Sequence, residues 1–285
     1  MDFQATRTAV EGIARQAGAA VMQYYGQAHH ETIKSNIYDV VTEGDHASEA
    51  VIVPALRDLF PAYPIISEEG GGGDDNASAE YAWYVDPVDG TTNFANNIPF
   101  FSVSIALAAR DLTPVVGVVY NPVSGELFSA ARGFGASLNG TPIHVARLAA
   151  LSRAVLSSGF PTQRHTLADN NIHQWTTMLM EVRDLRRFGS AALELAFVAA
   201  GRLDGFWERH IHSWDCLAGL LMVQEAGGRT SDYDGGVDAL YTGASIVATN
   251  GLIHDEVLAV LRRWSSDEAS SSTRTSPQQY SPDSW

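Results

Sequence analysis

The sequence predicts an α+β protein whose helices and strands stack in the layers of an αβαβα sandwich. Two observations predict this fold. The first half of the chain places two helical patterns before a run of strand patterns, and the second half alternates strands with helices. The 285 residues, 45% of them hydrophobic, are enough for one large domain. We therefore expect a single domain over residues 1–265, with an α+β half over about 1–150 and an α/β half over about 151–265.

In the first half, apolar residues at helical spacing predict a helix over residues 4–26 and a second helix over 50–60. Pro54 should kink the second helix or mark its first turn. A short strand over 64–66 leads into Glu68. Further strands are expected over residues 81–85, 100–108, 115–120 and 128–131. The strand over 81–85 should end at Asp86-Pro87, and Asn139-Gly140 is typical of a hairpin turn.

In the second half, strand patterns alternate with helix patterns. Strands are expected over residues 154–158, 185–188, 206–208 and 245–248. Helices are expected over residues 168–182, 190–200, 214–226 and 254–264. From Ser265 onward the composition shifts to Ser, Thr, Pro, Gln and Asp, which cannot bury a core, so residues 266–285 are expected to form a disordered tail.

Charge and composition argue against several classes of partner. The formal net charge of −15 repels nucleic acid and anionic lipid. A phosphate ester bound by so acidic a chain would need a cation to shield it, and a metal ion is the natural candidate. The single cysteine, Cys216, allows no intrachain disulfide. Without a signal-peptide pattern or an apolar run of membrane-spanning length, the chain is expected to be cytoplasmic, with no membrane partner.

Two carboxylates, Asp86 and Asp89, stand three residues apart where an apolar strand is expected to end. A tight turn can bring both side chains, and the Val88 carbonyl between them, to one side. Hard oxygen ligands of this kind are those that Mg²⁺ prefers. Gly90 permits a backbone position that a side chain would block, and a short helix opening at Thr91 would direct free N–H groups toward an anion.

Each carboxylate also has a structural interpretation. Asp45 could be the N-cap of the second helix, and Asp215 could complement the dipole of a helix that Ser213 caps. Glu68 and Glu69 could be a solvated pair at the end of a strand. The metal site is favoured because the run from Asp86 to Thr92 combines two acids, Pro, Gly and two hydroxyls within seven residues.

Several motifs together resemble the inositol monophosphatase family. They are K-S-N-I-Y-D-V-V-T-E-G-D (34–45), I-S-E-E (66–69), W-Y-V-D-P-V-D-G-T-T-N-F (83–94), G-S-A-A (189–192) and W-D-C-L-A-G-L-L-M-V-Q-E-A-G-G (214–228). The resemblance covers roughly residues 5–264. It implies the layered sandwich shared with the fructose-1,6-bisphosphatases and a lithium-sensitive, Mg²⁺-dependent phosphatase with two to three ions per site.

The resemblance also implies a role for each matching residue. The first Mg²⁺ would be held by Glu68, Asp86 and the Val88 carbonyl, the second by Asp86, Asp89 and Asp215, and a third by Glu68 with waters. The N–H groups of Gly90 and Thr91 would bind the phosphate, while Thr91 and Asp45 would orient and help deprotonate a metal-activated water. The alcohol would contact the Gly189-Ser190-Ala191 segment and Glu208, assisted by Asp89 and Asp215. Lys34, the only lysine, lies in a segment resembling an active-site loop of the family.

Inositol monophosphate is the expected substrate, because Thr92-Asn93-Phe94 and the spacing of Glu208 from Asp215 resemble the inositol-phosphatase pattern. Fructose 1,6-bisphosphate, histidinol phosphate and 3′-phosphoadenosine phosphate remain open as alternatives on the same scaffold. A metal-binding relative without turnover and a two-metal nuclease are less favoured. The resemblance further implies a homodimer.

Other residues have competing interpretations. His210 and His212 could form a zinc pair on one face of a strand, but packing roles are favoured. Arg186 and Arg187 could contact an interface or a second phosphate, or simply be solvated. Cys216 is expected to be a small buried residue and not a catalytic thiol.

Overall fold

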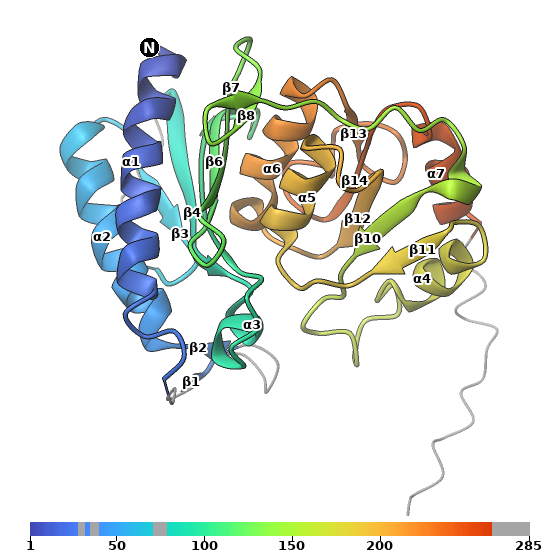
Figure 1. The fold of residues 1–285 in the computed structure, drawn as a ribbon, viewed down its shortest axis with the longest axis horizontal. Coiled ribbons are helices and arrows are strands. Elements are labelled where there is room, and N and C mark those ends of the chain that lie inside the picture. Colours follow the sequence, from blue (N-terminus) through green and yellow to red (C-terminus); the bar gives the residue numbers. More distant parts are fainter. Residues whose placement is uncertain (28–31, 35–39, 71–78, 264–285) are drawn as a thin grey trace, which may run out of the picture.

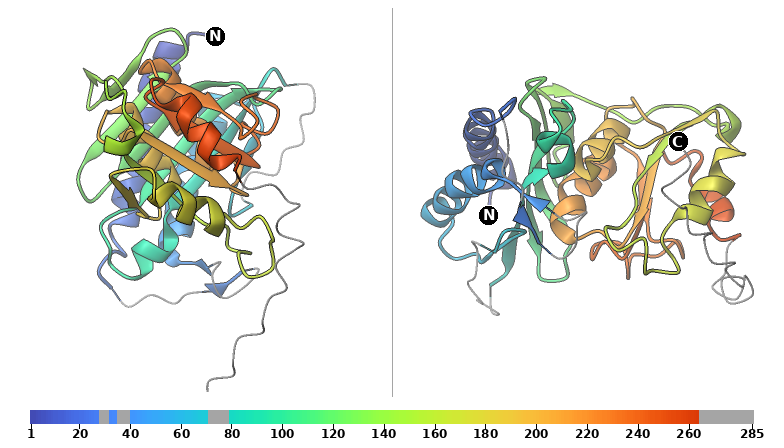
Figure 2. Two further views of the ribbon diagram at one scale, coloured as in Figure 1. Left: turned by 90° about the vertical axis from the view of Figure 1, so that its right-hand side faces the viewer. Right: turned by 90° about the horizontal axis from the view of Figure 1, so that it is seen from below.

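The computed structural model describes residues 1–27, 32–34, 40–70 and 79–263. Two sheets and three helical layers alternate, as Figures 1 and 2 show. Helices α1 and α2 cover the outer face of a seven-stranded sheet, α5 and α6 fill the space between the two sheets, and α4 and α7 cover the far face of a five-stranded sheet. The predicted αβαβα sandwich is therefore confirmed. The expected tail over 266–285 lies outside the described residues.

The outer helical layer consists of α1 (Phe3–Val21) and α2 (Glu43–Leu59). The prediction placed the start of α2 at residue 50, which is wrong by a full two turns. A capping box between Thr42 and Asp45 starts the helix earlier. Pro54 lies in the middle of α2 on its exposed side, where it removes one backbone hydrogen bond, while the buried face around Ile52 and Leu56 holds the helix against the sheet.

The seven-stranded sheet has the order β3-β4-β5-β6-β7-β8-β9, and all its pairs except β3–β4 are antiparallel. Its strands are β3 (Ile65–Ser67), β4 (Tyr81–Asp89), β5 (Ser102–Ala109), β6 (Pro114–Asn121), β7 (Glu126–Ala131), β8 (Ala136–Leu138) and β9 (Thr141–Pro142). A separate pair is formed by β1 (Thr32–Ile33) and β2 (Val40–Val41). The predicted hairpin at Asn139-Gly140 joins β8 to β9, with positive φ at both residues.

Strand β4 does not end at Asp86-Pro87 as predicted. It continues to Asp89 through a shift in register against β5, where Asp86 pairs with Ser104 but Asp89 pairs with Ser102. The extra residue is a bulge, and a bulge is where a strand tolerates a proline, which has no N–H to donate. The bulge places both carboxylates at the end of the sheet. The short helix α3 (Thr91–Ala95) follows directly.

The five-stranded sheet has the order β11-β10-β12-β14-β13, with β10 parallel to both of its neighbours. Its strands are β10 (Val155–Ser158), β11 (Asp184–Arg186), β12 (Gly205–Arg209), β13 (Arg229–Ser231) and β14 (Ser245–Thr249). The 3-10 turn η1 (Leu151–Arg153) precedes the first of these strands in the chain. The helices of this half of the chain are α4 (Ile172–Leu179), α5 (Ala191–Ala199), α6 (Ser213–Glu225) and α7 (His254–Leu261). Helix α4 was predicted to start at residue 168. It starts at Ile172, because Asn171 before it has a left-handed backbone.

The central helices α5 and α6 are apolar around their whole circumference, since they pack on a sheet on each side. Their residues contribute most of one core cluster. Other clusters lie under α1 and α2, under α4 and α7, and around Val88 and Phe94 at the end of β4. None of the helices in the described ranges is both long and apolar enough to cross a membrane.

Candidate active site

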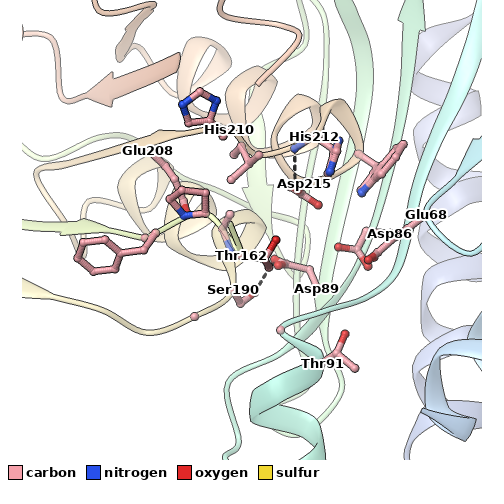
Figure 3. Close-up of a pocket in the computed structure, with 18 of the residues that line it drawn as sticks. Glu68, Asp86, Asp89, Thr91, Thr162, Ser190, Glu208, His210, His212 and Asp215 are labelled. Atoms are coloured by element: carbon pink, nitrogen blue, oxygen red, sulfur yellow. Dashed lines mark hydrogen bonds between the residues drawn. The ribbon is translucent and has the colours of Figure 1, made fainter. Parts of the chain in front are cut away.

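A pocket lies between the two sheets, where the end of β4, the end of β12 and the first turns of α5 and α6 meet (Figure 3). Of the residues proposed from the sequence, the pocket is lined by Lys34, Glu68, Asp86, Val88, Asp89, Gly90, Thr91, Gly189, Ser190, Ala191, Glu208 and Asp215. Asp45 does not line it but touches it through Thr91. Segments far apart in the chain thus bring together the residues that the motifs proposed.

The β4 side of the pocket presents Asp86 and Asp89, both buried. Asp86 accepts a hydrogen bond from the Val88 N–H at 3.0 Å, which fixes the turn of the bulge. On the outer side of this turn, the Ser48 hydroxyl donates to the Pro87 carbonyl at 2.8 Å and ties the bulge to α2. The side chains at the end of β4 are therefore held by both the sheet and a helix.

Asp89 caps α5 across the gap between the two sheets. Its Oδ2 accepts a short hydrogen bond from the Ser190 hydroxyl at 2.6 Å (Figure 3). It also accepts one from the Ala192 N–H at 2.7 Å. Its Oδ1 accepts only a longer bond from the Ala191 N–H, at 3.3 Å. A carboxylate at this position complements the positive end of the helix dipole. Oδ1 therefore has the weaker contacts with the protein of the two carboxylate oxygens.

Asp215 lies in the first turn of α6, but the expected cap at Ser213 is wrong. Ser213 is the first residue of the helix, and His212 occupies the cap position. The Asp215 carboxylate accepts a hydrogen bond from the His212 N–H at 2.7 Å (Figure 3). The side chain reaches back over the start of the helix and faces Asp86 and Asp89.

Thr91 and Asp45 form a hydroxyl–carboxylate pair at the β4 side. The alternative that Asp45 is the N-cap of α2 is wrong, because Thr42 is the cap and Asp45 lies three residues into the capping box. Asp45 Oδ2 accepts from the Thr42 N–H and hydroxyl at 2.8 and 2.6 Å, so Oδ1 is left to face the Thr91 hydroxyl at 3.3 Å. The same hydroxyl lies 3.1 Å from the Val88 carbonyl.

Lys34 Nζ donates to Glu68 at 3.0 Å and also to Glu69. Burial lowers the pKa of the Lys34 amine, but the two carboxylates outweigh burial and raise that pKa overall. The alternative of a solvated Glu68–Glu69 pair is therefore wrong. Both acids share one cation at the mouth of the pocket.

Gly90 has φ 97°, which is a backbone conformation that glycine adopts without strain. A Cβ there would lie 3.0 Å from the Gly189 carbonyl and 3.2 Å from the Phe100 carbonyl. The close approach of Gly90 to Gly189 brings the start of α3 against the loop before α5. The Asn93 side chain secures the same contact by donating to the Phe100 and Phe188 carbonyls at 2.6 and 2.7 Å.

The opposite wall is formed by Glu208 near the end of β12 and by residues that the sequence did not point to. These are Gly159, Phe160, Pro161, Thr162, Gln163, Glu194, Ile211 and Trp214. The pairing that brings them here is seen only in the structure: β10 and β12 are parallel neighbours, and the residues that follow parallel strands meet at one edge of the sheet. Buried Glu194 accepts from the Phe188 and Gly189 N–H groups at 2.6 and 3.2 Å and holds the loop before α5.

The histidines do not form the alternative zinc pair. Strand β12 ends at Arg209 and His210 has a positive φ, so His210 and His212 do not share a strand face. His210 contacts Asp169 at 2.9 Å, and His212 stacks on Trp214. Arg187 lines the pocket, whereas Arg186 pairs with Asp184. Cys216 is buried, as predicted.

Several of the carboxylates that line the pocket are buried close to one another. Burial raises the pKa of Asp86 and Asp215 well above the ordinary range, and the neighbouring acids raise it further. Burial also raises the pKa of Asp89 to about 6, even though Ser190 donates to it. Buried carboxylates are costly unless they are paired or bind a metal ion. Among the described residues, no three acidic, histidine or cysteine side chains stand together as a group that could hold a metal ion. The donors are nevertheless all oxygen atoms, which fits Mg²⁺.

Fold and site define a member of a known enzyme class. The chain belongs to the inositol monophosphatase family, whose model matches residues 2–266.

The similar proteins bear two different names, inositol-1-monophosphatase and Nus factor SuhB. The chain is 44% identical to an inositol-1-monophosphatase of Synechocystis over 87% of this chain and 86% of that protein. It is 42% identical to the Nus factor SuhB of Escherichia coli over 89% and 94% of the two chains. Among solved structures, an inositol monophosphatase from Anabaena superposes with TM-score 0.83, at 38% identity over 93% of this chain and 98% of that one. These relatives establish a phosphatase family but leave the substrate to be proposed.

Proposed function

We propose that this protein is a Mg²⁺-dependent phosphatase that hydrolyses inositol monophosphate to inositol and phosphate. The observation that carries the proposal is the set of carboxylates Glu68, Asp86, Asp89 and Asp215 around one pocket, beside the Thr91–Asp45 pair. The family supplies the reaction class, and the relative named inositol-1-monophosphatase supports the substrate.

The residues that would hold Mg²⁺ are Glu68, Asp86, Asp89, Asp215 and the Val88 carbonyl. Bound divalent ions neutralise charge on the phosphoryl oxygens and leaving alkoxide and make an attacking water more acidic. Asp89 Oδ1, which carries only the long bond from Ala191, is free enough to serve as a ligand while Oδ2 keeps α5 in place. Two to three ions per site agree with the number of carboxylates.

The Thr91–Asp45 pair would orient the attacking water and take its proton. Thr91 Oγ1 can accept a hydrogen bond from water while its own proton is directed to Asp45 Oδ1. Burial raises the pKa of Asp45 to about 7, despite two hydrogen bonds from Thr42, so this carboxyl is suited to exchange a proton near neutral pH. Glu68 would orient the water from the opposite side.

The phosphate would bind at the N–H groups of Gly90 and Thr91, and Lys34 would contribute positive charge at the mouth of the pocket. The alcohol would then extend toward Gly189, Ser190 and Ala191, and its hydroxyls would reach Glu208. Asp89 and Asp215 would contact the hydroxyl next to the scissile bond. Each candidate site residue would then contact the metal ions, the attacking water or the bound substrate.

The proposal is tested by kcat/KM for four substrates with Mg²⁺: inositol 1-phosphate, fructose 1,6-bisphosphate, histidinol phosphate and 3′-phosphoadenosine 5′-phosphate. Inositol 1-phosphate is expected to have the highest value, and millimolar Li⁺ should inhibit its hydrolysis. A higher value for another ester would move the assignment to that ester. No phosphate release from any of the four would contradict the enzyme and favour a relative that binds metal without turnover.

We further propose a cytoplasmic homodimer. Helix α4 exposes apolar side chains, with Ile172 and Leu179 on one face and Met180 following at 82% exposed. A contiguous apolar face is typical of an interface. Light scattering should give twice the mass of 30.7 kDa, and Leu179→Glu should give the monomer. A monomer in the wild type would contradict the dimer.

A further inference from the structure

The wall of the pocket that faces the metal ligands is positioned by a buried amide that the proposed mechanism does not use. Asn171 lies just before α4 and is fully buried. Its backbone has φ 71°, the left-handed region that Asn tolerates better than most side chains. The conformation directs the side chain under the loop that lines the pocket.

All four hydrogen-bonding positions of the Asn171 amide are used. Its Nδ2 donates to the Ser158 hydroxyl and to the Gly159 carbonyl, both at 2.7 Å. Its Oδ1 accepts from Trp207 Nε1 at 2.9 Å and from the Tyr233 hydroxyl at 3.3 Å. One side chain therefore joins the end of β10, the middle of β12 and the segment after β13. A buried network of this kind favours a single arrangement.

Glu208, the residue proposed to bind the alcohol, follows Trp207 directly in β12. Ser158 pairs with Trp207 between β10 and β12, so Gly159 and Glu208 lie next to each other at the pocket edge. A Cβ on Gly159 would overlap the Glu208 carboxylate. The Glu208 carboxylate thus occupies the position that a side chain at residue 159 would take.

Two other contacts hold the same loop from outside the pocket. Phe160 packs on Trp175 of α4, with ring centroids 5.3 Å apart, and Trp175 packs in turn near Trp207. Asp169 pairs with Arg209 at 2.7 Å and with His210 at 2.9 Å. The segment from Gly159 to Asp169 is thus tied to α4 through Phe160 and to the end of β12 through Asp169.

We propose that Asn171 and Gly159 are specificity-determining positioning residues, which fix the Glu208 carboxylate and the 159–163 wall against the hydroxyl-bearing part of the substrate. This inference rests on the proposed function. Neither residue takes part in the chemistry at phosphorus, because their contacts all lie on the β12 side. Their loss should change recognition of the alcohol and spare the reaction itself.

The test uses Asn171→Gly, which keeps the left-handed backbone and removes the four hydrogen bonds, and Gly159→Ala, which fills the space of the Glu208 carboxylate. The matched control is Asn250→Gly, which removes a buried amide bonded to Leu148, Leu252 and Ile253 near the opposite end of β12. The substrates are inositol 1-phosphate and p-nitrophenyl phosphate, whose leaving group has no hydroxyl for Glu208.

Both pocket variants are expected to raise KM for inositol 1-phosphate about tenfold, as for a lost hydrogen bond to a charged group. Their kcat for inositol 1-phosphate, and both their kcat and KM for p-nitrophenyl phosphate, should stay within about threefold of the wild-type values. The control should keep the wild-type ratio of the two kcat/KM values, even if its melting temperature falls. An unchanged ratio in both pocket variants, or an equal loss on both substrates, would overturn the inference.

A crystal structure of Asn171→Gly gives a second readout that does not depend on turnover. The 159–163 wall and the Glu208 carboxylate should shift relative to the wild type, and unchanged positions would overturn the inference. Absence of phosphate release in the wild type would instead contradict the proposed function, and the displacement of Glu208 would still decide the positioning role.

Discussion

The two walls of the pocket are assembled in different ways. The β4 wall takes Asp86, Val88, Asp89, Gly90 and Thr91 from one short stretch of chain, and a bulge directs them to one side. The β12 wall takes its residues from segments after β10, before α5 and at the end of β12.

This difference indicates a division of tasks. A contiguous turn fixes the mutual positions of ligands within narrow limits, as metal binding and phosphate transfer require. A wall built from separate loops can change one residue at a time and so adapt to different alcohols. Changes on the β4 wall should therefore lower kcat, and changes on the β12 wall should raise KM.

The largest effect is expected for Asp89→Asn. The change removes one negative ligand, and kcat should fall about 10²- to 10³-fold, equivalent to roughly 3–4 kcal/mol of transition-state stabilisation. The fold should persist, because the Asn oxygen can still accept from Ser190 and Ala192. Turnover at saturating Mg²⁺ and the melting temperature are measured together. A variant with near-normal kcat would refute the ligand assignment.

A somewhat smaller effect is expected for Thr91→Ala. The loss of the hydroxyl between the reacting water and Asp45 should lower kcat about 10²-fold, within the usual range for proton-transfer groups. Thr91→Ser restores the hydroxyl and should recover most of the rate. Equal rates for the Ala and Ser variants would show that the hydroxyl has no part in the reaction.

On the β12 wall, Glu208→Ala should raise KM for inositol 1-phosphate about tenfold and leave kcat within about threefold. The carboxyl binds the alcohol in both the ground state and the transition state, so its loss affects binding and not the chemical step. Initial rates over a range of substrate concentrations separate the two constants. A fall in kcat as large as that of Asp89→Asn would show that the β12 wall takes part in the chemical step and not only in binding.

The smallest effect on activity is expected at His254, far from both walls. Burial between Ser231 and Thr249 lowers its pKa to about 4 from 6.5. Above pH 6.5 the ring is neutral in both folded and unfolded chains, so its contribution is complete. As the pH falls toward 4, the unfolded chain takes up the proton first, and roughly 2–3 kcal/mol of stability is lost.

Urea unfolding of wild type and His254→Gln between pH 7.5 and 4.5 measures this contribution. The difference between the two unfolding free energies should shrink as the pH falls, while kcat at pH 7.5 stays the same. A difference that is independent of pH would show that His254 is not held neutral.

The sequence predicted the layers well because each element has a clear period of apolar residues, as in α1 and in the strands β5 and β6. It misplaced the start of α2 because the capping box at Thr42 comes before any apolar repeat. It ended β4 too early because Pro87 suggests a break, whereas a bulge accommodates it. In both cases a local hydrogen-bonding feature overrode the pattern.

The candidate site, too, could be predicted only in part from the sequence. The ligands of the β4 wall were proposed because they are neighbours in the sequence. Gly159 and Asn171 were not, since their importance comes from the pairing of β10 with β12 and from contacts with Trp207 and Tyr233. Such contacts between distant segments leave no pattern in a single sequence.

The carboxylates of the β4 wall are proposed to act through a divalent cation. This proposal is tested most directly by phosphate release from inositol 1-phosphate by the wild-type protein, first after chelation and dialysis and then with Mg²⁺ restored. We predict that the chelated protein releases no phosphate and that Mg²⁺ restores the full rate. Release at an undiminished rate after chelation would show that the carboxylates do not act through a metal ion.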